Sequence, residues 1–381
     1  MADIQPFYVM ELLARARALE AKGRSIIHME IGEPDFVTPE PIRAAAKRAL
    51  DEGRTHYTPA VGLPALREAI SGFYHDQYGV EVSPERILIT PGASGALLLA
   101  MGVLLDPGDE ILIADPGYPC NRNFARLVEG RAVGIPVGAD SGYQLNGGLL
   151  QAHWTEHTVG AMLASPANPT GTIVPNASLR DMAAVAQARG GRLVVDEIYH
   201  GLVYEGETES AVAVSDELFV INSFSKYFCM TGWRLGWLVA PEAYVRDLDK
   251  LAQNLFLAAP TLSQYAALEA FAPETRAVLD AQREDFRRRR DFLLPALRAL
   301  GFEIPVTPQG AFYLYADCSR FTGDSYAFAL DLLERAGVAV TPGRDFGSND
   351  PERHLRFAYT TSLEKLQEGV RRLAGYLSAM A

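Results

Sequence analysis

Short apolar runs alternate with longer amphipathic segments between about residue 83 and residue 240. The runs are rich in Ile, Leu and Val and are bounded by Gly, Pro or polar residues, which is typical of buried β-strands. Alternation with helical segments predicts an α/β domain that has a mainly parallel central sheet with helices on both faces. The expected strands are 87–90, 110–115, 159–165, 192–196, 217–222 and 236–240, and the clearest expected helices are 94–105 and 178–189.

The pattern changes after about residue 251, where a long helix is expected to run through residues 283–300. Shorter elements follow it and predict a smaller α+β domain at the C-terminal end. The expected strands there are 311–316, 338–340 and 354–359, and the expected helices are 325–336 and 362–377.

These patterns divide the chain into three expected parts. Residues 1–45 are expected to form an N-terminal arm and part of the small domain. Residues 46–275 are expected to form the large domain, and residues 276–381 the small C-terminal domain.

Polar and glycine residues follow the carboxyl ends of five predicted strands. Open α/β sheets bind ligands in the crevice outside the carboxyl ends of their strands, so these groups are expected to converge on one site. The five segments are residues 91–94, 115–118, 166–168, 196–197 and 223–226.

Charge narrows the range of partners. The chain has 35 Lys and Arg residues against 47 Asp and Glu residues, which gives a formal charge of −12. That excess disfavours binding to nucleic acid and to anionic lipid. The basic run Arg287 to Arg290 lies beside Glu284 and Asp285 at helical spacing and predicts a solvated helix face.

Cysteine usage and hydropathy predict a cytoplasmic protein. Cys120, Cys229 and Cys318 are widely separated, without the spacing of a disulfide framework or a metal site. The first residues lack the order of a signal peptide, and no apolar run approaches the roughly 20 residues of a membrane span. We therefore expect no metal, no membrane partner and no nucleic acid partner.

Lys226 lies directly after a predicted buried strand, in the segment NSFSKYF. A lysine forms an imine with an aldehyde cofactor only while its amine is neutral, and desolvation and a nearby cation such as Arg234 favour the neutral amine. A single lysine in such a place is more often a surface loop residue. Its neighbours in the predicted crevice therefore decide between the two interpretations.

Asp196 ends the strand LVVD, where a buried carboxylate needs a cationic or hydrogen-bonding partner. A protonated pyridine nitrogen would be such a partner and would keep a cofactor ring electron-withdrawing. Tyr199 would point the same way as Asp196 across a helical turn, with its hydroxyl near a phenolic oxygen. The alternatives are a helix N-cap for Asp196 and core packing for Tyr199.

A predicted anion site begins at Gly92, Ala93 and Ser94, which open a helix directly after a strand. The unpaired N–H groups of a helix N-terminus bind phosphate, although a serine there is usually only a cap. The hydroxyls at positions 223 and 225 and the guanidinium of Arg234 are candidates for further contacts to the same phosphate.

Two further polar residues are candidates for substrate binding. Asn168 lies in the turn SPANPTG, where asparagine is common for conformational reasons alone. Arg356 alternates with Leu355 and Phe357 in a predicted strand, so it is either an edge charge or an arginine placed to bind a carboxylate.

Nine motifs in chain order resemble those of the class I/II aminotransferases, which are fold-type I enzymes dependent on pyridoxal 5'-phosphate, and the resemblance covers essentially the whole chain. The motifs are GEPDF from Gly32, YTPAVGLPALREAI from Tyr57, TPGAS from Thr90, DPGYP from Asp115, NPTG from Asn168, DEIY from Asp196, SFSK ending at Lys226, MTGWRLG containing Arg234, and RFAY from Arg356. Any one of these motifs would occur by chance, whereas all nine in order would not.

The resemblance implies a role for each matching residue. Lys226 would form the Schiff base and move the proton, Asp196 would bind the pyridinium nitrogen, and Tyr199 and Asn168 would bind the phenolic oxygen. Arg356 would bind the substrate α-carboxylate, and Gly32 would line the substrate site. The cofactor ring would stack on Tyr118, and its phosphate would be held by Ala93, Ser94, Ser223 and Arg234.

The implied activity is amino transfer between an L-amino acid and a 2-oxo acid by a ping-pong mechanism. In such families Tyr57 reaches the cofactor phosphate of the neighbouring subunit, which implies a homodimer with two shared active sites. A carbon–sulfur β-lyase of the same fold is the alternative, because it would use the same lysine on a substrate with a leaving group at Cβ.

The substrate side chain stays open at this stage. Some aspartate-specific relatives carry a lysine at the position of Ser94, where it contacts the side-chain carboxylate. The serine in this chain argues against a dicarboxylate preference. Arg122 is a weak substitute, and an exposed helix arginine is the expected interpretation.

Overall fold

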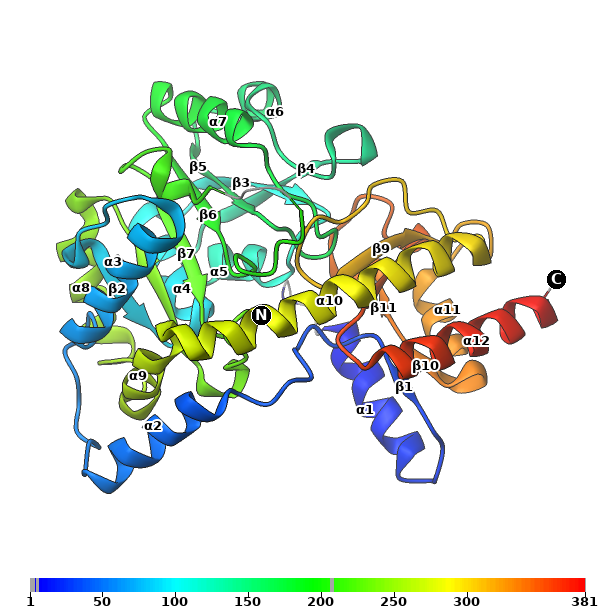
Figure 1. Cartoon of the computed structure of the whole chain (residues 1–381). Helices are drawn as coiled ribbons and strands as arrows, with labels where there is room; N and C mark the ends of the chain where they lie inside the picture. The colour runs from blue at the N-terminus through cyan, green and yellow to red at the C-terminus, as the bar shows by residue number, and fades with distance from the viewer. Residues whose placement is uncertain (1–3, 5–6, 206–208, 381) are drawn as a thin grey trace.

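A seven-stranded sheet lies at the centre of the larger part of the computed structural model, which describes residues 4, 7–205 and 209–380 (Figure 1). Within these residues, the strand order is β2-β8-β7-β6-β5-β3-β4, and β8 alone runs antiparallel to its neighbours. The strands are β2 (Ile87–Thr90), β3 (Glu110–Asp115), β4 (Arg131–Pro136), β5 (Thr158–Ala164), β6 (Arg192–Asp196), β7 (Phe219–Ser223) and β8 (Gly236–Val239). The predicted α/β fold with a mainly parallel sheet is confirmed.

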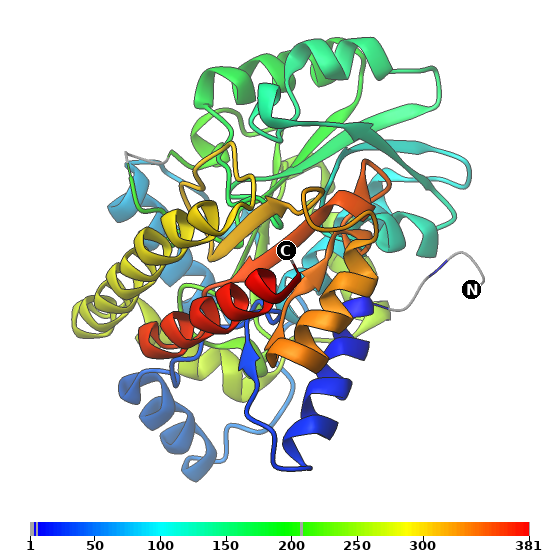
Figure 2. The same ribbon diagram turned by 90° about the vertical axis from the view of Figure 1, so that its right-hand side faces the viewer.

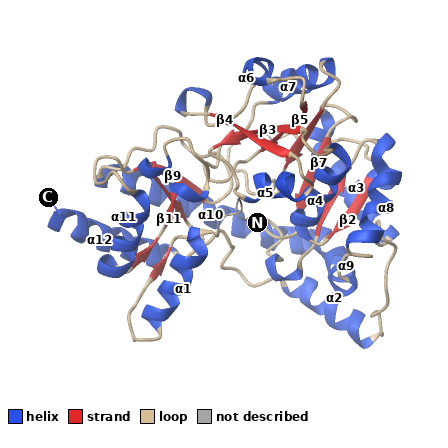
Figure 3. Cartoon of the chain, turned by 180° about the vertical axis from the view of Figure 1, so that it is seen from behind, coloured by secondary structure: helices blue, strands red, loops and turns tan. Residues whose placement is uncertain are grey.

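Both faces of this sheet are buried. Along β6, Val194 packs into one apolar cluster, whereas Leu193 and Val195 pack into the other. Alternate side chains point to opposite faces of a strand, so apolar residues at every position require helices on both faces. Figure 3 shows helices on either side of the strands. The helices of the larger part are α2 (Glu40–Asp51), α3 (Pro64–Tyr78), α4 (Gly92–Leu104), α5 (Cys120–Leu127), α6 (Gly147–His153), α7 (Asn176–Ala188), α8 (Glu242–Leu255) and α9 (Thr261–Ala267), of which α3, α4, α5 and α7 contact the strands directly.

The smaller part is an α+β arrangement, as predicted. Strands β11 (Thr341–Pro342), β12 (His354–Ala358) and β9 (Tyr313–Asp317) form an antiparallel sheet in that order. Helix α11 (Ser325–Asp331) packs beside β11 and β12, and helix α12 (Leu363–Met380) packs against β10 (Val338–Ala339) and the long helix α10 (Pro273–Leu300) (Figure 2). Helix α10 runs between the two parts (Figure 1).

The N-terminal segment contributes to both parts. Helix α1 (Tyr8–Glu20) packs against β10 and β11, and β1 (Ile27–His28) pairs in parallel with β10 (Val338–Ala339). Helix α2 packs instead against α9 in the larger part. The exact domain boundaries expected from the sequence stay a prediction.

Several predicted boundaries are corrected. Strand β9 begins at Tyr313 rather than at residue 311, because Ala311 has φ of +57°, outside the extended region. The helix expected at 325–336 changes to a π-helical turn over Leu332–Ala336. Strand β4 was not predicted, because it lies at the sheet edge and most of its residues are partly exposed rather than forming an apolar run.

The basic run on α10 is not a solvated face throughout, and this expectation was wrong. Arg287 and Arg288 are exposed, but Arg289 is only 3% exposed and bridges Asp285 and Asp35. Its guanidinium also lies over the rings of two phenylalanines, Phe36 and Phe286. Consecutive residues on a helix point about 100° apart, so a run of four must include inward positions.

Among the described residues, no helix is both long enough and apolar enough to cross a lipid bilayer.

Replacing Arg289 with Ala is expected to lower the free energy of unfolding by about 3 kcal/mol, because the change removes a buried guanidinium that packs on two phenylalanine rings and leaves Asp35 without this partner. Chemical denaturation followed by circular dichroism measures this loss. Arg288→Ala is the matched control, because that side chain is 63% exposed and its loss should matter by less than about 0.5 kcal/mol. Equal losses in the two variants would contradict the structural role of Arg289.

Candidate active site

A cavity of about 440 Å³ lies where the carboxyl ends of the strands in the large sheet meet the smaller part. Ten of the twelve residues predicted for the site line it: Gly32, Ala93, Ser94, Tyr118, Asn168, Asp196, Tyr199, Lys226, Arg234 and Arg356. The predicted convergence of strand ends on one crevice is therefore observed. The two remaining residues, Ser223 and Tyr57, do not line the cavity.

Lys226 extends from the turn that follows β7 and donates a hydrogen bond from Nζ to the carbonyl of Gly32 at 2.7 Å. The pKa of its amine is lowered to about 8, mainly by desolvation and to a smaller extent by the positive charges of Arg356 and Arg234. The carboxylates of Glu33 and Asp196 act in the opposite direction. About a tenth of the amine is therefore neutral at pH 7, far more than for an ordinary lysine, and the neutral amine is the form that attacks a carbonyl.

Asp196 is the last residue of β6 and is almost fully buried. Burial raises the pKa of its carboxyl to about 7, and a hydrogen bond from the backbone N–H of Ile198 at 3.0 Å lowers it only in part. A carboxyl group in this position is stabilised as the anion by any cation that enters the cavity.

An anion cradle is built around the start of α4, directly after β2. Gly92 has φ of +71°, and a Cβ there would lie 2.6 Å from Nη2 of Arg234. Likewise, a Cβ at Gly236 would lie 2.8 Å from the backbone nitrogen of Ala93. Gly92 therefore lets the guanidinium of Arg234 approach the helix N-terminus, and Gly236 lets strand β8 approach it. A guanidinium beside a helix N-terminus suits an anion such as phosphate.

The serines beside Lys226 differ in position. Ser223 is buried, with its Oγ 3.1 Å from the carbonyl oxygen of Leu235, and it accepts a hydrogen bond from the backbone of Ser225. Ser225 lines the cavity instead. The structure thus offers the hydroxyl of Ser225 to a ligand, and a phosphate contact of Ser223 stays a prediction.

Arg356 connects the smaller part to the larger one. It lies on β12, and its Nη1 donates to Oδ1 of Asn168 at 2.9 Å, while its Nη2 donates to the carbonyl of Glu30 at 2.6 Å. Its Nε is buried, and no described residue forms a hydrogen bond with it. A guanidinium in a cavity with an unused donor is prepared to bind a carboxylate.

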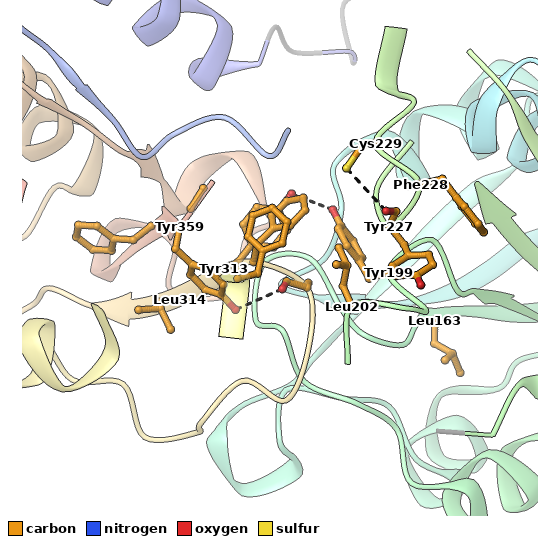
Figure 4. Packing of buried hydrophobic residues seen from close by; sticks show 14 of the residues in the cluster. Leu163, Tyr199, Leu202, Tyr227, Phe228, Cys229, Tyr313, Leu314 and Tyr359 are labelled. Atoms are coloured by element: carbon orange, nitrogen blue, oxygen red, sulfur yellow. Dashed lines mark hydrogen bonds between the residues drawn. The ribbon is translucent and has the colours of Figure 1, made fainter. Parts of the chain in front are cut away.

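Tyr199 and Tyr313 were not expected to form a pair. Their hydroxyl oxygens lie 2.9 Å apart in the buried interior (Figure 4). Tyr313 also lines the cavity, and the guanidinium of Arg356 lies 4.3 Å from the centre of its ring. Sequence reasoning missed Tyr313 because its motif, GAFYLY, indicated only a strand.

The N-terminal segment forms one wall of the cavity, through Phe7, Val9 and Met10. The carboxylate of Asp345 accepts hydrogen bonds from the backbone N–H groups of Tyr8 and Val9 at 2.8 and 2.9 Å. Those groups have no partner within helix α1, so Asp345 fixes the start of the helix at the cavity.

Tyr57 and Arg122 do not line the cavity, and they differ in exposure. Tyr57 is 83% exposed and lies on the surface of its own chain. Arg122 is partly buried, so its interpretation as an exposed helix residue was wrong, and its Nε forms no hydrogen bond with any residue that the structure describes.

Among the residues that the structure describes, no group of three His, Cys, Asp or Glu side chains is placed to hold a metal ion. The cavity instead combines a partly neutral amine, a buried acid, an anion cradle and a second guanidinium.

Comparison with known proteins extends this picture. Residues 24–373 match the family model described as aminotransferase class I and II. A valine–pyruvate aminotransferase of Mycobacterium tuberculosis is 40% identical, over 99% of this chain and 97% of that protein. An aspartate/prephenate aminotransferase of Thermus thermophilus is 36% identical, over 98% of this chain and 97% of that protein.

The solved structures agree with the sequence comparison. The crystal structure of an aminotransferase from Mycobacterium tuberculosis superposes with a TM-score of 0.96 at 40% identity, over 99% of this chain and 98% of that chain.

The lowered pKa of Lys226 leads to a testable pH dependence. Covalent labelling of Lys226 by a small aldehyde, trapped with borohydride and located by peptide mass spectrometry, is expected to rise with a midpoint near pH 8. The amine is protonated and unreactive below that pH and neutral above it. Labelling that begins to rise only above pH 10 would contradict the desolvated position of the amine.

Proposed function

Because this chain belongs to the class I and II aminotransferase family and is a transaminase, we propose that it uses pyridoxal 5'-phosphate carried on Lys226. The observation that supports this most directly is the hydrogen-bonded, desolvated amine of Lys226 in a cavity that also contains Asp196 and the anion cradle. The relatives favour this activity over the carbon–sulfur β-lyase alternative.

The residues of the cavity fit the chemistry of this cofactor. The start of α4 with Arg234 and Ser225 suits a phosphate, and the close approach at Gly92 keeps these donors together. Asp196, whose carboxyl pKa is raised to about 7 by burial, suits a protonated pyridine nitrogen. Tyr118 supplies an aromatic ring for stacking, and Tyr199 and Asn168 supply polar groups for a phenolic oxygen.

When bound, pyridoxal phosphate supplies an aldehyde that accepts the amino group and a protonated ring that withdraws electrons from the reacting carbon. The protein supplies position and proton transfer. We assign to the Nζ of Lys226 the removal of the proton from the substrate Cα, because a pKa of about 8 suits a base that works near neutral pH. Asp196 is assigned to the ring, where its carboxylate would pair with the protonated pyridine nitrogen.

Substrate orientation is assigned to Arg356. Its unpartnered Nε and its position beside Asn168 suit a bidentate contact with the α-carboxylate, and Gly32 lines the same cavity. Amino acid and 2-oxo acid are expected to use this contact in turn, as a ping-pong exchange requires.

We propose that the protein is a homodimer in which Tyr57 enters the cavity of the partner subunit. Tyr57 is 83% exposed and lies outside the cavity of its own chain, which agrees with that arrangement. Cytoplasmic residence stays a prediction.

We propose that the amino donor has a neutral side chain. The described residues that line the cavity include three cations, Lys226, Arg234 and Arg356, and each has an assigned role above. Leu97, Ile31 and Phe346 add an apolar lining, and position 94 is a serine. The valine–pyruvate aminotransferase that is 40% identical suggests valine and pyruvate as the first pair to assay.

The cofactor assignment predicts a visible absorption band in protein loaded with pyridoxal phosphate. Lys226→Ala is expected to abolish that band and to lower transamination by at least about a thousandfold, because it removes both the point of attachment and the base. Absorption spectra and a coupled assay measure the two effects. A variant with an unchanged spectrum would contradict the role of Lys226.

The substrate assignment predicts that valine is a better donor than aspartate with pyruvate as acceptor. Ser94→Lys adds a cation to the cavity and should raise kcat/KM for aspartate relative to valine by about tenfold, equivalent to about 1.4 kcal/mol. Ser94→Met is the control for side-chain length without charge. A wild-type preference for aspartate would overturn the proposed substrate class.

A further inference from the structure

Tyr313 makes a contact that its place in a strand does not require. It lies at the start of β9 in the smaller part, yet its hydroxyl oxygen is 2.9 Å from that of Tyr199, which follows β6 in the larger part. The two rings meet nearly edge to face, with centres 5.7 Å apart (Figure 4). Both side chains are buried and both line the cavity.

The position of the Tyr313 hydroxyl is fixed by its surroundings. A Cβ on Gly32 would overlap this hydroxyl, so the oxygen occupies the space that the glycine leaves open. The carbonyl of the same glycine accepts the hydrogen bond from Lys226. On the face of the ring, the guanidinium of Arg356 lies 4.3 Å from the ring centre, within the range of a cation–π contact. Tyr313 therefore contacts three groups of the site at once.

The direction of the hydrogen bond between the two tyrosines follows from proton counting. Burial raises the pKa of both hydroxyls, so each carries one proton at neutral pH. If Tyr199 donates its proton to an acceptor in the cavity, the bond between the tyrosines must be donated by Tyr313 to the oxygen of Tyr199. A hydroxyl that accepts one hydrogen bond becomes a stronger donor in another, so the bond from Tyr313 strengthens Tyr199 as a donor.

We propose that Tyr313 is a positioning residue of the transamination site, whose hydroxyl donates to Tyr199 and so strengthens the hydrogen bond from Tyr199 to the phenolic oxygen of pyridoxal phosphate. This inference rests on the proposed function. It assigns to the smaller part a direct influence on the electronic state of the cofactor, separate from the substrate contact of Arg356.

The test is a pH titration of the visible absorption of the protein loaded with pyridoxal phosphate. Tyr313→Phe keeps the ring beneath Arg356 and removes only the hydroxyl. The midpoint of the spectral transition is expected to rise by roughly half a unit to one unit, the equivalent of one hydrogen bond to the charged form. In a Tyr199→Phe background the same substitution should add no further shift, because its effect passes through Tyr199.

Tyr359→Phe is the matched control. Its hydroxyl is also buried in the smaller part, 3.4 Å from the carbonyl oxygen of Ala311, and its loss should leave the spectral midpoint unchanged. Gly32→Ala, which displaces the Tyr313 hydroxyl, should move the midpoint in the same direction as Tyr313→Phe. This variant gives a second test if Tyr313→Phe is poorly folded.

The possible outcomes distinguish the role of Tyr313 from the proposed function. A wild-type band whose midpoint is the same in Tyr313→Phe, or a full shift that persists in the Tyr199→Phe background, would overturn the role of Tyr313 alone. A wild-type protein without a visible band in the presence of pyridoxal phosphate would overturn the proposed function and this role with it.

Discussion

The site depends on the desolvation of Lys226 and Asp196. An amine and a carboxyl group are brought into a low-dielectric cavity, and burial moves both pKa values toward neutrality, to about 8 and about 7. In water the two groups would be fully ionised and chemically inert near pH 7. The parallel sheet creates this situation because Asp196 ends β6 and Lys226 lies in the turn after the adjacent strand β7, so both residues line the cavity.

The smaller part helps to enclose the cavity and supplies Arg356, the residue assigned to substrate binding. Arg356 on β12 donates to Asn168 on the other side of the cavity, and Tyr313 on β9 contacts Tyr199. These polar contacts cross between the two parts at the cavity, so the geometry of the site depends on how the parts are packed. Arg289 on α10 stabilises the same arrangement. Its ion pair with Asp35 connects α10 to the segment that follows Gly32.

Much of this architecture was predictable from sequence, for physical reasons that differ among its elements. Buried strands such as β6 were found because their central residues are apolar, and the polar residues at and after their ends marked the crevice, which gave Lys226, Asp196 and Asn168. Edge strand β4 lacks that apolar run and was missed. The tyrosine pair was missed because Tyr313 reaches Tyr199 only through packing across 114 positions of sequence, which no local pattern encodes. The burial of Arg289 was missed because its charge predicted an exposed side chain, whereas its position on the helix directs that side chain toward the interior.

The hydrogen bonds from Tyr8 and Val9 to Asp345 join segments 336 or more residues apart in the chain. One wall of the cavity is thereby supplied by a short N-terminal peptide that carries none of the groups assigned to proton transfer or anchoring. Such a division makes the wall an exchangeable part: residues 7–10 can diverge during evolution, or be varied in an engineered library, while the catalytic groups on the sheet stay unchanged.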